Sequence, residues 1–116
     1  MALVDDIFAA LTAGAQAGAA AASTAAKDLT QDVRTFVIPH LHEVAVQVAS
    51  IVTKRLNGTY SDLTAKTLID SEEDAIQAIV ETMVALTVLE SQQIVNAVID
   101  SLNKAVNTAL GFTLLL

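Results

Sequence analysis

The stretch from Ser71 to Gly111 contains no glycine or proline between its two ends, so nothing in it is expected to stop a helix. Ser71 precedes a run of acidic residues, 72–74, and a side-chain cap followed by negative charge is typical of a helix start. The pattern predicts a helix over residues 71–110, either straight or broken near residue 90. At 1.5 Å per residue, such a helix is roughly 60 Å long.

This long helix has more apolar surface than one neighbouring helix can cover. The section from Thr82 to Leu89 carries no charge on any face, so we expect burial all round it. Beyond it, the apolar tail at residues 111–116 is unusual, because termini are normally polar and frayed. These features predict that oligomerisation completes the fold and that a neighbouring subunit holds the tail. The polar residues that remain form a narrow strip: Gln93, Asn96, Asp100, Asn103, Lys104 and Asn107.

The N-terminal part predicts a helix over residues 3–37 with a flat ridge of small side chains. Ala10, Gly14, Gly18 and Ala22 recur every four residues, which places them on one helix face. Such a ridge lets another backbone approach closely, either within the chain or between copies. The alternative is that the two glycines mark a flexible joint near residues 14–18.

Pro39 disfavours helix at the residue before it and fits the first turn of a new one, which predicts a helix over residues 39–56. Gly58 stops that helix, and a short helix over 61–69 begins on the cap residue Ser61. No stretch shows the period-two alternation of a strand. We therefore expect an all-α fold in one domain of 116 residues, a long-helix hairpin or a small helical bundle.

Composition argues against several classes of function. Hydrophobic residues make up 53% of the chain and charged residues 16%, against about 25% charged in average domains. The net charge of −7 repels nucleic acid. There is no cysteine, so thiol catalysis and thiolate metal sites are excluded. Because the first residues are acidic and no secretory signal is recognised, we expect a cytoplasmic location or one within a particle.

His40, His42 and Glu43 are the best candidates for metal ligands, since imidazole and carboxylate bind zinc and iron. However, a di-iron bundle needs a Glu-x-x-His pair on each of two helices. Here the order is His-x-x-Glu, and the pair occurs once, on the polar face of a helix. This favours a solvated helix start over a metal site. No phosphate-binding loop or nucleophile elbow is present. We expect no enzymatic activity and no cofactor.

The first hypothesis for function is a structural protein that self-associates or packs into a larger complex, such as a virion or filament, through its apolar helices. The alternative is a membrane-active helical protein of the pore-forming or lysis type, and a weaker one is a metal-binding bundle. The expected oligomer interface comprises Gly14, Gly18, Met83, Leu86, Ile94, Val95, Val98, Ile99, Leu102, Val106, Phe112, Leu114, Leu115 and Leu116.

Overall fold

The computed structural model describes residues 2–25, 27–83 and 86–115 and confirms the all-α prediction. Within these residues no strand is present, apart from an isolated bridge between Thr24 and Lys27. The described residues form five helices: α1 (Leu3–Ala22), α2 (Thr30–Phe36), α3 (Ile38–Leu56), α4 (Asp62–Glu81) and α5 (Val88–Leu110).

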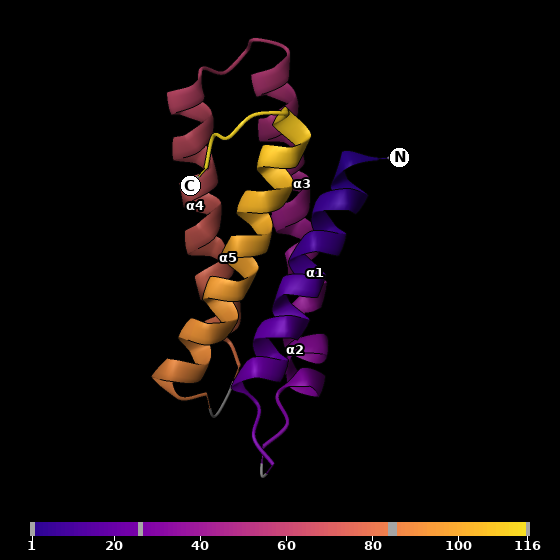
Figure 1. Ribbon diagram of the computed structural model, residues 1–116, viewed down its shortest axis with the longest axis vertical. Helices are drawn as coiled ribbons and strands as arrows, with labels where there is room; N and C mark the ends of the chain where they lie inside the picture. Colours follow the sequence, from indigo (N-terminus) through magenta and orange to yellow (C-terminus); the bar gives the residue numbers. More distant parts are fainter. Residues whose placement is uncertain (1, 26, 84–85, 116) are drawn as a thin grey trace.

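The four long helices run alternately down and up in chain order, and α2 lies at the end where α1 is joined to α3 (Figure 1). Around the bundle, α1 packs on α3 and α5, and α4 packs on α3 and α5; α1 and α4 lie diagonally opposite. The closest pair is α1 with α5, which run antiparallel although they are the first and last helices. The bundle measures 49 × 27 × 20 Å.

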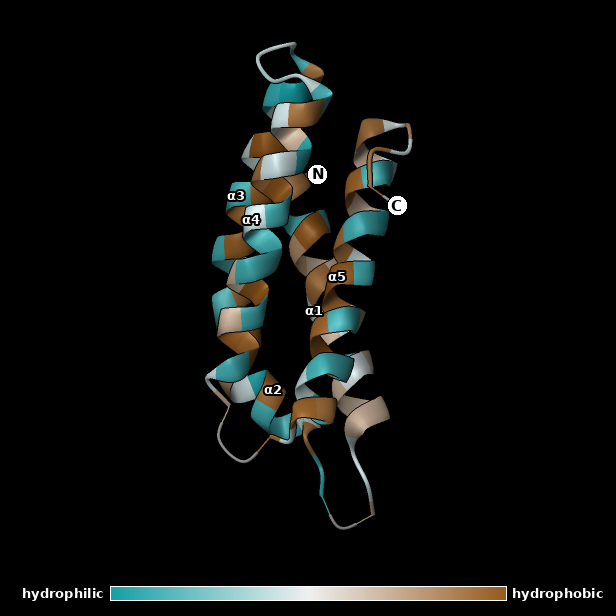
Figure 2. Cartoon of the chain, turned by 90° about the vertical axis from the view of Figure 1, so that its left-hand side faces the viewer, coloured by the Kyte–Doolittle hydropathy of each residue, from teal (hydrophilic) through white to brown (hydrophobic). Residues whose placement is uncertain are grey.

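A single chain buries an aliphatic core. Hydrophobic stretches face the interior and hydrophilic ones the outside (Figure 2), and the buried side chains described are alanine, valine, leucine, isoleucine and methionine. The accessible surface is 6228 Å², close to the roughly 6,000 Å² of a folded monomer of this mass. The long helices therefore cover most of their apolar surface without a second copy.

The predicted helix 3–37 is wrong as one element, because α1 ends at Ala22 and α2 begins only at Thr30. The Ser23 hydroxyl stabilises the break: it donates to the Ala19 carbonyl (2.7 Å) and accepts from the Leu29 amide (2.8 Å). Residues 14–18, proposed as a flexible joint, lie inside the continuous helix α1. A local side-chain hydrogen bond thus ends an alanine-rich helix that intrinsic propensity would continue.

The predicted helix 39–56 agrees with α3, and Gly58 follows it with φ +84°. The predicted helix 61–69 and the helix start at Ser71 are wrong, since α4 runs through both from the Ser61 cap. The Ser71 hydroxyl donates to the Thr67 carbonyl (3.4 Å) instead of capping a new helix. The buried residues Ile69 and Ile76 lie on one face across this point, so packing favours continuity.

The predicted helix 71–110 is broken between Glu81 and Val88. The prediction that Thr82–Leu89 is buried on every face is also wrong. Met83 is buried, but the side chain of Val88 is 76% exposed and that of Leu89 is 66% exposed. Residues 84 and 85 lie outside the described residues. The break lets α5 turn back and pack along α1. Continuing one helix would leave that apolar face in solvent.

The C-terminal tail folds back onto its own chain. Gly111 closes α5 with φ +81°, and the Asn107 side chain then binds the tail three times. Its amide donates to the Leu115 carbonyl (2.7 Å), and its oxygen accepts from the amides of Leu114 (2.8 Å) and Leu115 (2.9 Å). Leu115 is buried. The described residues of the tail are therefore held by their own chain, and not by a neighbouring subunit as predicted.

Candidate functional site

The seam between α1 and α5 is the closest helix contact in the molecule. A Cβ added at Gly14 would lie 2.5 Å from the Ser101 Oγ and 2.8 Å from the Ala97 carbonyl oxygen. A Cβ at Gly18 would lie 2.9 Å from the Ile94 Cα. The ridge of small residues thus makes a contact within the chain, and α5 fills the space beside both glycines.

Toward the N-terminus of α1 the seam opens into a groove of about 510 Å³. Its lining is mostly aliphatic, with the charged groups Asp6 on α1 and Lys104 on α5. Both charged residues are exposed, and neither has an ion-pair partner within the described part of its own chain. We define the α1/α5 groove by its lining residues: Leu3, Asp6, Ile7, Ala10, Ala13, Ser101, Lys104, Ala105, Thr108 and Ala109.

Beside the groove, the outer face of α1 is a surface of alanine. Ala9, Ala13, Ala17 and Ala20 are exposed, and their spacing of three or four residues places them on one side of the helix. No charged residue occurs in α1 after Asp6. A long uncharged face therefore continues from the groove along the bundle.

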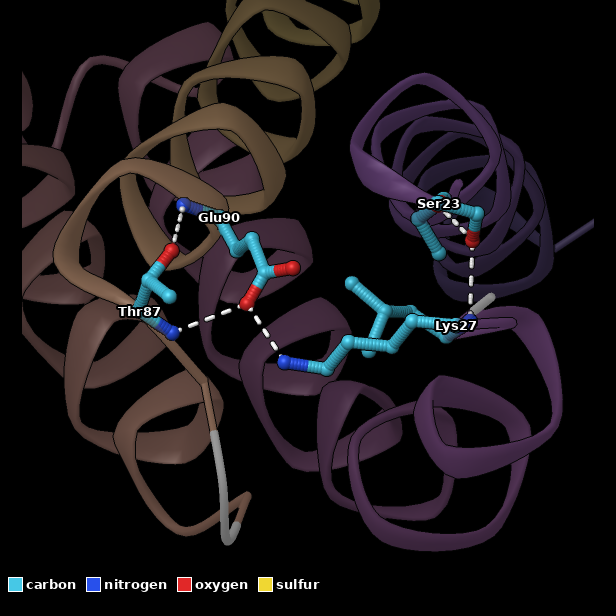
Figure 3. Close-up of polar contacts among 6 residues, drawn as sticks. Ser23, Lys27, Thr87 and Glu90 are labelled. Carbon is cyan, nitrogen blue, oxygen red and sulfur yellow. Dashed lines mark hydrogen bonds and ion pairs between the residues drawn. The ribbon is translucent and has the colours of Figure 1, made fainter. Parts of the chain in front are cut away.

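At the opposite end, a polar cluster ties the connection after α1 to the start of α5 (Figure 3). The Lys27 ammonium lies 2.8 Å from the Glu90 carboxylate. The same carboxylate oxygen accepts from the Thr87 amide (2.9 Å), and the Glu90 amide donates to the Thr87 hydroxyl (3.1 Å), forming a capping box. These bonds, led by the one from Lys27, lower the pKa of Glu90. The cluster has a structural role, because its polar groups bind one another.

The predicted metal ligands do not converge. His40, His42 and Glu43 are all exposed on α3, and His42 packs its ring edge-on against Phe8 with centroids 5.3 Å apart. Burial and the charge of Glu43 raise the pKa of Glu72 across the α3–α4 contact. Among residues 2–25, 27–83 and 86–115, no three histidine, cysteine or acidic side chains are placed to share a metal ion.

Most residues predicted at an oligomer interface belong to the core of one chain. The buried ones are Met83, Ile94, Val95, Val98, Leu102, Val106 and Leu115, besides the two glycines. Leu86, Ile99 and Leu114 are half-buried against that core, and Phe112 is 40% exposed under the Arg55 guanidinium. Leu116 lies outside the described residues. Most of the described residues in the predicted interface therefore pack within one chain.

Sequence reasoning missed the groove. The sequence places Lys104 in the narrow polar strip of the long helix and gives no sign that Asp6 lies near it. The α1 ridge indicated close packing but did not identify α5 as its partner. Only the antiparallel pairing of the first and last helices brings the two charges to the same groove.

In the part of the chain that the structure describes, no single helix passes a length-and-hydropathy test for a membrane span, although the bent pair of α2 and α3 does so together. Comparison with models of protein families, with curated proteins and with solved structures gives no match to this chain.

Proposed function

We propose that this protein is a non-enzymatic structural protein that self-associates or packs into a larger assembly. The observation that carries the proposal is the large apolar side chains that remain exposed after the core is complete. They are Phe36, Val46, Leu56, Leu63, Val88, Leu89 and Phe112. Exposed apolar surface that gathers in patches is typical of contact sites between proteins.

These side chains concentrate at the two ends of the bundle. Leu56 (55% exposed) and Leu63 (76%) flank the connection from α3 to α4 at one end. Val88 and Leu89 begin α5 at the other end (Figure 1). Contacts between unlike ends of successive copies produce open filaments when the rotation between copies does not close a ring. The arrangement supports end-to-end packing in a larger complex.

Each end contact combines a gain from apolar burial with a cost from charge repulsion. Burying one exposed leucine or valine gains roughly 1.5–3 kcal/mol before the costs of association. The net charge of −7 on each copy opposes that gain. Each end contact is therefore weak on its own, and added salt strengthens association by screening the charge.

The test is the mass of detergent-free protein by light scattering across a concentration series at low and moderate salt. We expect a rise above the 12.1 kDa of the monomer, larger when salt is added. Leu63→Ser with Leu89→Ser removes one apolar side chain from each end and should reduce the rise. Val46→Ser, on a side face of α3, is the matched control.

Compact 12.1 kDa monomers at every concentration and salt would contradict the proposal. Insolubility that only detergent relieves, together with pelleting on liposomes, would replace it with the membrane-active alternative.

A further inference from the structure

We propose that two copies of this chain pair side by side through the α1/α5 groove, about a two-fold axis that places Asp6 of each copy opposite the partner's Lys104. This inference rests on the proposed function and deepens it, because it names the partner and the contact surface.

The chemistry of the α1/α5 groove suits a second copy of the chain. Its walls are small and mostly apolar, so the helices of a second copy can approach closely. The exposed alanine face of α1 extends this surface without a further charge on α1. The surface next to the groove therefore adds little desolvation cost to pairing.

The two charged side chains of the groove complement each other across a two-fold axis. Asp6 and Lys104 line the same groove and have no ion partner within the described chain. A two-fold rotation about the point midway between two groups exchanges their positions. An isologous contact centred there brings each carboxylate opposite the partner's ammonium, which gives two equivalent ion pairs.

Much of the negative charge lies on a helix away from the groove. Six of the thirteen acidic residues are on α4: Asp62, Asp70, Glu72, Glu73, Asp74 and Glu81. Helix α4 is diagonal to α1 and makes no contact with it. Pairing through α1 and α5 therefore points much of the negative charge of each copy away from the other.

A side of the bundle offers more area for a contact than an end does. A standard interface buries about 800 Å² on each partner. The bundle is 49 Å long, whereas an end spans 27 × 20 Å. A side-by-side contact can therefore bury more surface than an end contact, and the apolar ends join dimers in the larger assembly.

The experiment is a charge-reversal cycle on the full chain, with dimer dissociation constants measured by sedimentation at low salt. Asp6→Lys and Lys104→Asp each place like charges opposite each other, and we expect each to weaken pairing at least about tenfold. The double variant restores both ion pairs and should return to within about threefold of the original constant. Circular dichroism checks that every variant keeps its helices.

The controls separate specific pairing from overall charge. Asp6→Lys reduces the net charge from −7 to −5, so non-specific repulsion alone would make this variant pair more tightly. Asp74→Lys makes the same change on the exposed face of α4 and should not weaken pairing. Tighter or unchanged pairing of Asp6→Lys would overturn the proposal, and so would a double variant no better than the singles.

Cross-linking provides a second measurement, because the chain has no cysteine. Ala10→Cys places a thiol in the groove near the proposed axis, and a short bismaleimide should join two copies. Ala78→Cys, exposed on α4, is the matched control and should stay largely unlinked. Equal linking of both variants would count against the groove.

The outcomes distinguish this inference from the proposed function. If the charge-reversal variants associate normally while Leu63→Ser with Leu89→Ser abolishes association, the groove proposal fails and the structural role stands. If the unmodified chain is monomeric throughout, both fail.

Discussion

Adding one methyl group at Gly14 or Gly18 tests the packing of α1 on α5 directly. In an exposed helix, alanine in place of glycine stabilises by about 1 kcal/mol. Here the new Cβ at Gly18 would lie 2.9 Å from the Ile94 Cα and 3.0 Å from the Ala97 Cβ. These atoms belong to or adjoin the α5 backbone, so they move only if the helices separate.

Overpacking of this kind costs typically ~1–3 kcal/mol, and it must exceed the gain in helix propensity. Subtracting the propensity gain, we expect Gly18→Ala and Gly14→Ala each to lower the free energy of unfolding by up to about 2 kcal/mol. For a chain of this size that is a fall of up to about 8 °C in Tm. Urea unfolding followed by circular dichroism at low protein concentration measures the change.

A second substitution shows whether the clash is the cause. At Gly14 two of the three closest atoms, 2.5 and 2.9 Å away, belong to the Ser101 side chain. Ser101→Gly removes both, so it should recover part of the loss from Gly14→Ala while remaining additive with Gly18→Ala. If both alanine variants are instead about 1 kcal/mol more stable than the original chain, α1 and α5 do not approach as closely as described.

Four further predictions concern polar side chains. Thr87→Ala removes the cap of α5 and should cost about 1 kcal/mol in urea unfolding. Asn107→Ala releases the tail and should abolish hydrogen-exchange protection of the C-terminal amides, whereas Asn96→Ala, an exposed amide on the same helix, should not. The pKa of Glu90 is lowered in the folded state, so its charge stabilises the fold above about pH 4.5. Glu90→Gln should therefore lower the free energy of unfolding at pH 7. The difference between the two proteins should vanish as the pH falls through the pKa of Glu90 in the folded state. Glu72 has a raised pKa, so Glu72→Gln should stabilise at pH 7, with the gain lost as the pH falls toward 4.5.

The position of the candidate groove shows how far sequence reasoning reaches. The four-residue repeat through Gly14 and Gly18 predicts a close helix contact, and the structure confirms one. The repeat does not identify the helix that makes this contact, because a face of small side chains allows any helix backbone to approach closely. Asp6 and Lys104 lie far apart in the chain and share no local pattern, so their meeting at one groove was beyond prediction.

The amide strip on α5 illustrates the same limit. The sequence places Gln93, Asn96 and Asn107 in the same narrow polar strip. Gln93 and Asn96 are exposed, but Asn107 binds the tail of its own chain. The role of Asn107 depends on the turn at Gly111, which brings the tail back along α5.

The sequence by itself determined the helical class, the boundaries near Pro39 and Gly58, and the small face of α1. These features depend on local geometry, because helix periodicity, proline and glycine act within a few residues. The tertiary structure decided where the two long helical patterns break, at residues 23–29 and 82–87, neither of which contains glycine or proline. Breaking a helix there loses a few hydrogen bonds. It allows α5 to bury its apolar face against α1, and only the folded chain contains that contact.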